Sequence, residues 1–578
     1  MLFEEMIVLV ALMLFPSIII DGNSINAEIN DCSFEDSIQD LQIYDANSVS
    51  ISNASLNQDD HDNIVITKCN ELTLGENILI PNINYQNYET STLNIKCSDT
   101  TLKNSQIPIT IKLSYYTGEY DLNLFVLQNG ETVPENIFTL ADEKYTINTT
   151  TGTVEESNNN AGENITGITY AGIDSTTSLP TFYIYNAKGL ETFRDIVNGT
   201  ILNETTTSYE IPADSSIANG APYSITNTNG QQNIKGILQA DIDLSNIEWT
   251  PIGVESKEFA GDFDGNNKSI TNLKITDATT TNQGLFGVIN NILLREDKSS
   301  IKNLKLSGTI TSSATNVGGF AGNATNVSFE NCENNISIST SNTEIGGLVG
   351  IAETCDFANC VNLANISSTS TSGNICVGGI AGYITDVNAE YCYNAGDITG
   401  NTAVGGLFGY EVNSTLSNPT YDYCINTGKI TANSYFGGIL GYAHKALSFG
   451  YCANYGTIKS TSTNYFGCII GECDSVNKSQ VTECLVVGSV ETSGTEYYAV
   501  SKNASVSSSY YDSAILSITQ NPSGGETAKT TNELTNGTDL SNFYGEWSYE
   551  NGRYPIPNVR EKLSDYWDNI VTAATASN

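Results

Sequence analysis

The sequence predicts an all-β protein: a parallel β-helix-like solenoid of repeats with a β-rich region before it. Two short boxes that alternate between residues 317 and 490 carry this prediction. The first reads Gly-Gly-apolar-apolar-Gly, and its leading glycines are 28, 32, 27, 32 and 30 residues apart. The second reads Cys-x-Asn, and each copy follows a glycine box by 14 to 19 residues.

Both boxes occur six times, and their last copies are degenerate. The repeat glycines are Gly318, Gly319, Gly346, Gly347, Gly378, Gly379, Gly405, Gly406, Gly437, Gly438 and Gly467. The repeat cysteines are Cys332, Cys360, Cys392, Cys424, Cys452 and Cys484. The last glycine box has Cys468 as its second residue, and the last cysteine box has Val486 where the others have asparagine.

Stacking follows from the content of one repeat. Each repeat holds short segments rich in Ile, Val, Tyr and Thr, separated by Gly, Asn and Ser, which is typical of strands and turns. One such unit cannot bury its own apolar face, whereas stacked units can, because each strand pairs with its equivalents above and below. The repeats lack the i, i+3, i+4 apolar spacing of helices.

The expected organisation places this array between less regular segments. An apolar run from Met6 to Ile20 has the length of a signal peptide core and is short for a membrane span. Glu4 and Glu5 stand where such a peptide usually carries positive charge, so an uncleaved anchor is the alternative. We expect a signal peptide over 1–27, a β-rich region with divergent rungs over 28–150, a linker over 151–182, lead-in rungs over 183–310, the repeat solenoid over 311–495, a closing segment over 496–560 and a polar tail over 561–578.

The charge balance excludes two classes of partner. The chain carries 24 Lys and Arg against 65 Asp and Glu, a formal net charge of −41. Such a chain repels phosphate backbones and anionic lipid, so we expect no nucleic-acid partner. The charge favours solubility, with weak cation binding as the alternative. No second apolar run follows the first, so we expect no integral membrane segment after signal cleavage and a secreted or cell-surface location.

The repeats and their flanking segments resemble the GLUG-repeat family, named for its Gly-Leu-small-Gly box. Beyond the boxes, the resemblance rests on a lead-in at 189–193, an opening turn at 259–266 and a closing segment at 529–534 followed by Trp547 and 551–555. It covers roughly 183–557. The resemblance implies a parallel β-helix-like array on secreted and surface, often adhesin-like, proteins. It implies no catalytic residues.

The repeat cysteines should line up one rung apart. Adjacent rungs are about 4.8 Å apart with nearly parallel side chains, whereas a disulfide needs Cβ atoms about 3.8 Å apart, so we expect buried thiols along this column. Cysteines outside the column are better disulfide candidates, and the expected pairs are Cys355–Cys360 and Cys468–Cys473. The chain has no Cys-x-x-Cys, and His61 and His444 are isolated, so we expect no zinc site and no cofactor.

Catalytic chemistry finds little support. The acids in the repeats, such as Asp397, Glu411, Asp422 and Glu472, differ in their offsets within the repeat, so no catalytic cluster is predicted. Asp262 to Asn267 superficially resembles a calcium loop but departs from its order, and we interpret it as a turn. We therefore expect a non-enzyme, with a polysaccharide-active lyase or hydrolase and a purely structural coat protein as alternatives.

The expected function is adhesion, through binding of host or neighbouring-cell glycans or surface proteins. Tyrosines in or beside the repeats could form an aromatic stripe or simply fill strands and stack between rungs: Tyr410, Tyr435, Tyr442, Tyr451, Tyr455 and Tyr465. Glycosylation sequons are numerous, and those at Asn323, Asn326, Asn365 and Asn413 lie within the array.

Overall fold

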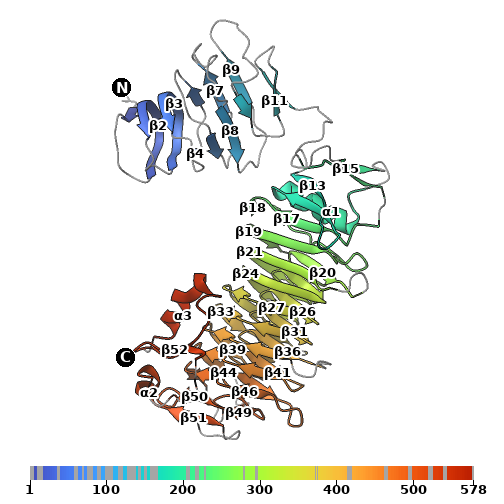
Figure 1. The fold of residues 1–578 in the computed structure, drawn as a ribbon, viewed down its shortest axis with the longest axis vertical. Coiled ribbons are helices and arrows are strands. Elements are labelled where there is room, and N and C mark those ends of the chain that lie inside the picture. The colour runs from blue at the N-terminus through green and yellow to red at the C-terminus, as the bar shows by residue number, and fades with distance from the viewer. Residues whose placement is uncertain are drawn as a thin grey trace. The chain divides into compact units, whose positions relative to one another are not determined.

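The computed structural model divides into two units, Met1–Ile165 and Thr166–Asn578. It describes the strands between residues 6 and 156, and 167–575 apart from 203–207, 215–220, 227–228, 246, 277–279, 293–296, 372, 374, 413–418, 461–465, 493–496, 519–524, 538–539, 541–542 and 544. The described chain is nearly all β, and the second unit contains a parallel β-solenoid of about nine turns (Figure 1). The predicted fold class is confirmed.

The first unit is a sheet of parallel strands followed by a hairpin. Its strands are β1 Met6–Leu9, β2 Ser17–Phe34, β3 Asp40–Leu56, β4 Asn63–Thr67, β5 Glu71–Leu74, β6 Asn82–Gln86, β7 Leu93–Cys97, β8 Ile109–Ser114, β9 Leu122–Val126 and β10 Phe138–Leu140, with β11 Tyr145–Asn148 antiparallel to β12 Thr153–Glu156. After β3, strands two apart in the chain pair in parallel, as in a coil with two strands per rung.

In this coil, Ile66 pairs with Tyr85 and Leu74 pairs with Cys97. The expected signal peptide overlaps β1 and the start of β2, and its cleavage stays a prediction.

A helix covers the start of the solenoid core. The hairpin of β13 Ile168–Ile173 and β14 Pro180–Ile184 lies inside the expected linker and already belongs to the second unit. Then α1 Ala187–Asn198 begins at Asn186, whose side chain accepts from Gly189 N. Phe193 of α1 packs edge-on against Phe263 at 5.8 Å between ring centroids. A solenoid end needs such a cap because its last rung has no neighbour. The β15 Tyr209–Ile211 and β16 Tyr223–Ile225 hairpin and β17 Lys235–Leu238 and β18 Ile242–Asp243 complete this region.

The rungs follow as three sheets. The largest, which starts with β13, β14, β17 and β18, continues with three long strands, β19 Asp262–Ile275, β21 Ser299–Ser312 and β24 Val327–Thr340. It then splits into three columns. The first column holds β27 Asp356–Ala358, β32 Asn388–Glu390, β37 Thr420–Asp422, β42 Ser448–Gly450, β46 Gln480–Thr482 and β49 Ser505–Ser507. The second holds β28 Val361–Asn362, β33 Tyr393–Asn394, β38 Ile425–Asn426, β43 Ala453–Asn454, β47 Leu485–Val486 and β50 Ser509–Asp512, and the third β29 Ile366–Ser368, β34 Ile398–Thr399, β39 Ile430–Ala432, β44 Ile458–Ser460 and β48 Val490–Glu491.

Two narrower sheets close each rung. The seven-stranded sheet contains β20 Phe286–Asn290, β23 Ala321–Thr325, β26 Val349–Glu353, β31 Ala381–Thr385, β36 Phe408–Glu411, β41 Leu440–Ala443 and β45 Ile470–Cys473. The five-stranded sheet contains β22 Val317–Gly318, β25 Ile345–Gly346, β30 Cys376–Gly378, β35 Ala403–Gly405 and β40 Phe436–Gly437. The leading glycines pair in register along this sheet, so they form one column.

A buried column of asparagines explains the second glycine of each box. The inner asparagine column consists of Asn334, Asn362, Asn394, Asn426 and Asn454, none of which has exposed surface. Each Nδ2 donates to the Oδ1 of the asparagine in the next rung at 2.7–2.8 Å, up to Asn454. A Cβ on Gly379 would lie 2.4 Å from Asn394 Oδ1 and 2.3 Å from Gly406 O, so no side chain fits there.

The last rung departs from this pattern at both positions together. Cys468 replaces the second glycine, and Val486 replaces the asparagine. Asn454 Nδ2 consequently has no hydrogen-bond partner among the described residues. Where a side chain replaces the second glycine, the asparagine that this side chain would contact is therefore replaced as well.

The repeat cysteines are buried and aligned, as expected from their spacing. The two expected disulfides, however, do not form: the four cysteines concerned are free thiols, as are the other six from Cys332 to Cys484. Cys355 Sγ donates to Ala324 O at 3.4 Å, whereas Cys360 Sγ donates to Phe329 O at 3.5 Å, so the two thiols face different strands of the preceding rung. Cys468 stands in the second-glycine column, and Cys473 Sγ contacts Ser501 Oγ at 3.6 Å.

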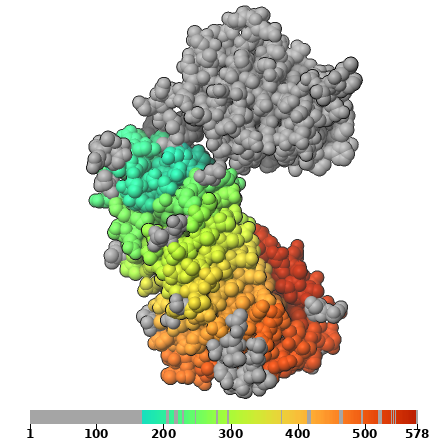
Figure 2. All heavy atoms as spheres, turned by 180° about the vertical axis from the view of Figure 1, so that it is seen from behind, coloured from blue at the N-terminus to red at the C-terminus, as the bar shows by residue number. Residues whose placement is uncertain are grey.

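The C-terminal segment folds back along the side of the solenoid. It comprises β51 Glu526–Lys529, α2 Thr531–Thr535, β52 Trp547–Ser548, β53 Ile556–Pro557, the 3₁₀ turn η2 Ser564–Tyr566 and α3 Trp567–Ala573. In Figure 2 these residues lie beside rungs much earlier in the chain. Residues 561–578 were expected as a polar tail, yet Leu563, Ile570 and Ala574 are buried against the second column of the large sheet.

Candidate functional site

The repeat acids lie in different columns. Glu411 is buried in β36, where its Oε2 accepts from His444 N at 2.9 Å and Lys445 N at 2.8 Å. Glu472 pairs with Lys502 at 2.9 Å on the outer face of β45.

The other two acids belong to the large sheet. Asp397 Oδ1 accepts from Lys429 N at 3.0 Å. Asp422 pairs in register with Glu390 of the rung before it, and burial, then the Glu390 charge, raise the Asp422 pKa. The described residues contain no group of three or more His, Cys, Asp or Glu arranged to hold a metal ion.

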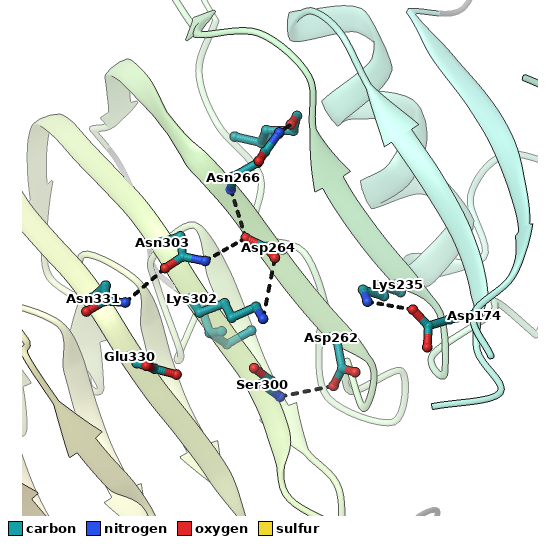
Figure 3. Close-up of polar contacts among 12 residues, drawn as sticks. Asp174, Lys235, Asp262, Asp264, Asn266, Ser300, Lys302, Asn303, Glu330 and Asn331 are labelled. Carbon is teal, nitrogen blue, oxygen red and sulfur yellow. Dashed lines mark hydrogen bonds and ion pairs between the residues drawn. The ribbon is translucent and has the colours of Figure 1, made fainter. Parts of the chain in front are cut away.

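The segment 262–267 bends within a strand, as the turn interpretation expects, because its pairing with β21 is interrupted between Asp264 and Lys268. It begins the 14-residue strand β19, and Asn266 and Asn267 adopt left-handed φ values of 51° and 59°. Its carboxylates contact the next strand: Asp262 Oδ1 accepts from Ser300 N at 3.0 Å, and Asp264 Oδ2 lies 3.6 Å from Lys302 Nζ (Figure 3). The acids therefore bridge two rungs and do not converge as a calcium loop requires.

The seven-stranded sheet presents an aromatic stripe. Its members are Tyr383, Tyr410 and Tyr442, which are in register on β31, β36 and β41, and Tyr435 beside them. Tyr383 and Tyr410 stack with centroids 6.0 Å apart and planes at 15°, and Tyr410 and Tyr442 at 5.1 Å and 12°. Tyr435 meets Tyr442 edge-on at 5.0 Å and is 36% exposed. The tyrosine stripe is thus a row of half-buried rings whose spacing is that of the rungs.

The phenols of Tyr383, Tyr410 and Tyr442 stay neutral at physiological pH. Burial raises the pKa of Tyr442 to about 12, and the Tyr410 phenol and the carboxylates of Asp474 and Glu472 act in the same direction. Burial likewise raises the pKa of Tyr383 and Tyr410. A neutral phenol both donates and accepts hydrogen bonds, so the stripe offers polar edges beside apolar ring faces.

The remaining tyrosines singled out in the sequence lie elsewhere. Tyr451 ends a second stack with Tyr391 and Tyr423, with centroids 4.8 Å apart. The C-terminal segment contacts this stack, since Tyr423 Oη donates to Glu546 at 2.8 Å. Tyr455 is buried beneath the same segment, and Tyr465 falls outside the described residues. The sequence marked tyrosines as a class, and only the register separates the stripe on the seven-stranded sheet from the stack that the C-terminal segment contacts.

The sequons within the array occupy different settings. Asn323 lies on β23 in the same column as Tyr383, two rungs before it. Asn326 adopts a left-handed φ of 60° at the corner before β24. Asn365 is exposed, and its Oδ1 accepts from Asp397 N at 2.9 Å. Asn413 falls outside the described residues, and glycosylation at all four stays a prediction.

Comparison with known proteins adds little beyond the fold. No family model matches the chain. No curated protein matches it. Among solved structures, the chain is similar to one described as "a putative immunoglobulin A1 protease from Bacteroides ovatus", with 17% sequence identity, a TM-score of 0.36 and coverage of 67% of this chain and 94% of that chain. This similarity is too distant to assign an activity, and membership of the GLUG-repeat family stays a prediction.

No helix in the part of the chain that the structure describes is long and apolar enough to cross a membrane.

Proposed function

We propose that this β-solenoid repeat protein is a secreted or cell-surface adhesion protein that binds glycans through the tyrosine stripe. The observation that carries the proposal is the register of Tyr383, Tyr410 and Tyr442, which places three nearly parallel rings in adjacent rungs of one sheet. Sugar rings have apolar faces that pack on aromatic rings and hydroxyl groups that bond to phenols. A row of such contacts suits an extended chain of repeating sugars because weak contacts add when they are linked.

The acids favour binding over cleavage. A glycosidase needs two carboxylates placed on either side of the bond that it breaks. Near the tyrosine stripe, Glu411 is buried and engaged by two backbone amides, and Glu472 pairs with Lys502. Neither carboxylate is available as half of such a pair, so a lectin-like role for the stripe is the more economical one.

The test is a glycan array followed by calorimetry on the best ligand. We expect the double variant Tyr410→Ala, Tyr442→Ala to lose about tenfold in affinity per ring, or about 1.4 kcal/mol each. Ile351→Ala is the matched control, because Ile351 pairs in register with Tyr383 on the same face and offers no ring. Absence of binding by the wild type, or equal loss in the control, would overturn the proposal.

Secretion is tested separately. The apolar run from Met6 to Ile20 supports a signal peptide. N-terminal sequencing of protein recovered outside the producing cell should begin after Ser24 or Ala27. Intact protein that stays with the membrane fraction would instead support the uncleaved anchor.

A further inference from the structure

A pocket of about 150 Å³ lies between the side of the solenoid and the C-terminal segment. The solenoid contributes Asn303, Asn331 and Asn359 from three successive rungs, together with Lys305 and Glu333. The folded-back segment contributes Lys562, Asp565 and Tyr566. This volume suits a single small ring, and the pocket opens to solvent.

The wall of this pocket is a second chain of asparagines, all with left-handed φ values of 52–53°. Their amides point in one direction: Asn359 Nδ2 donates to Asn331 Oδ1 and Asn331 Nδ2 to Asn303 Oδ1, each at 3.0 Å. The chain ends on Asp264, which accepts from Asn303 Nδ2 at 3.1 Å (Figure 3). We call these three residues the outer asparagine column.

The outer asparagine column leaves hydrogen-bonding capacity at one end. Asn359 Oδ1 is buried and has no donor among the described residues, because the next residue in the column is Tyr391, which stacks on Tyr423. Each amide Nδ2 carries two hydrogens, and the chain uses one of them. Because Asn359 Oδ1 has no accessible surface, a ligand in the pocket meets the unused amide hydrogens of the column rather than this oxygen.

The charges around the pocket cancel. Lys305 Nζ lies 3.2 Å from Glu333 Oε2 and 3.4 Å from Asp565 Oδ2, and Tyr566 donates to Glu333. Lys562 Nζ lies 5.9 Å from the centroid of the Tyr391 ring. Two cations and two carboxylates surround a polar space, so the pocket does not bind a charged ligand more tightly than a neutral one.

We propose that this pocket binds a single neutral sugar unit, such as the end of a glycan. The unused amide hydrogens of the outer asparagine column donate to the oxygens of the sugar. The site belongs to a different sheet from the tyrosine stripe, so this proposal does not depend on the function proposed above. It also gives the folded-back segment a role, because residues 562–566 form one wall.

The test is saturation-transfer NMR and calorimetry on the full chain. The probes are the methyl glycosides of glucose, galactose, mannose and N-acetylglucosamine, with methyl glucuronide as the charged comparison. We expect saturation transfer to at least one neutral glycoside, and no preference for the glucuronide. Asn359→Gly should weaken that binding at least tenfold, because glycine tolerates the left-handed φ but removes an amide donor from the wall.

Two variants serve as controls. Asn316→Gly is matched, since Asn316 also has a left-handed φ, of 60°, and donates to Asn282 in another chain of amides outside the pocket. It should bind as the wild type does. Tyr566→Phe, which keeps the ring and removes the wall hydroxyl, should weaken binding even if Asn359→Gly misfolds. No transfer to any neutral glycoside, preference for the glucuronide, or unchanged affinity in the pocket variants would overturn the proposal.

Discussion

Removing an asparagine from the middle of the inner asparagine column should cost far more stability than removing the one at its end. Asn394 has no exposed surface and takes part in three hydrogen bonds. Its Nδ2 donates to Gly396 O at 2.9 Å and to Asn426 Oδ1 at 2.8 Å, and its Oδ1 accepts from Asn362 Nδ2 at 2.7 Å. Asn394→Ala deletes all three.

The size of the effect follows from these contacts. Three hydrogen bonds at about 1 kcal/mol each give about 3 kcal/mol, and the stranded buried oxygen of Asn426 raises the cost toward about 5 kcal/mol. Asn454→Ala removes bonds from Asn426 Nδ2 and Gly456 N but also removes an Nδ2 that has no partner. Relief of that unpaired donor, worth about 1–3 kcal/mol, offsets most of the loss. We expect the two variants to differ by at least about 2 kcal/mol.

Urea unfolding followed by circular dichroism measures the difference. Long repeat arrays can unfold in stages, so the midpoint and the slope of each transition should be compared between variants. Both substitutions delete the same atoms from buried sites, which makes each the control for the other. An Asn454→Ala variant as unstable as Asn394→Ala would refute the argument that position in the column sets the cost.

Two further predictions concern ionisation. Lys235 and the backbone amide of Thr177 hold the pKa of Asp174 below its ordinary value, so this carboxylate stabilises the fold fully above about pH 4 and progressively less as the pH falls through the lower, folded pKa. The stability gap between wild type and Asp174→Asn, measured by urea midpoints, should therefore shrink below about pH 4, and a gap that does not change with pH would contradict this. Burial raises the pKa of Cys355 and Cys468 to about 12, so these thiols should react with a thiol reagent at pH 8 only after unfolding. The measurement uses a variant in which the three cysteines before residue 100 are replaced by serine. Fast reaction of this variant in its folded state would show that the core is open to the reagent.

The repeat columns could be predicted because they reflect the period of the chain. Residues about 30 apart fall at the same place in successive rungs, so the spacing of glycines and cysteines already implies their alignment. The asparagine in each Cys-x-Asn box was visible in the same spacing, but its hydrogen bonds were not, because a spacing does not say which side chains face inward. The paired change to Cys468 and Val486 in the last rung was the signal that could have shown the contact.

The disulfide prediction failed for a related reason. Nearness in sequence suggested that Cys355 could reach Cys360, yet the chain turns a corner between them and sends the thiols toward carbonyls of different strands. The Asp-Gly-Asn segment at 264–266, by contrast, bends as its composition indicates: Asn266 and Asn267 adopt left-handed φ values, and the pairing with β21 is interrupted between Asp264 and Lys268.

The sequence by itself determined that the chain is a stack of parallel rungs and which residues recur along it, because one short period repeats contacts of a fixed separation. Only the tertiary structure decided which tyrosines are exposed together, and that the C-terminal segment returns to contact Glu333, which lies 233 residues before Tyr566. That contact occurs once, so it leaves no periodic trace. It depends on the apolar row that the second column of the large sheet presents after folding, and this row exists only once the rungs have stacked.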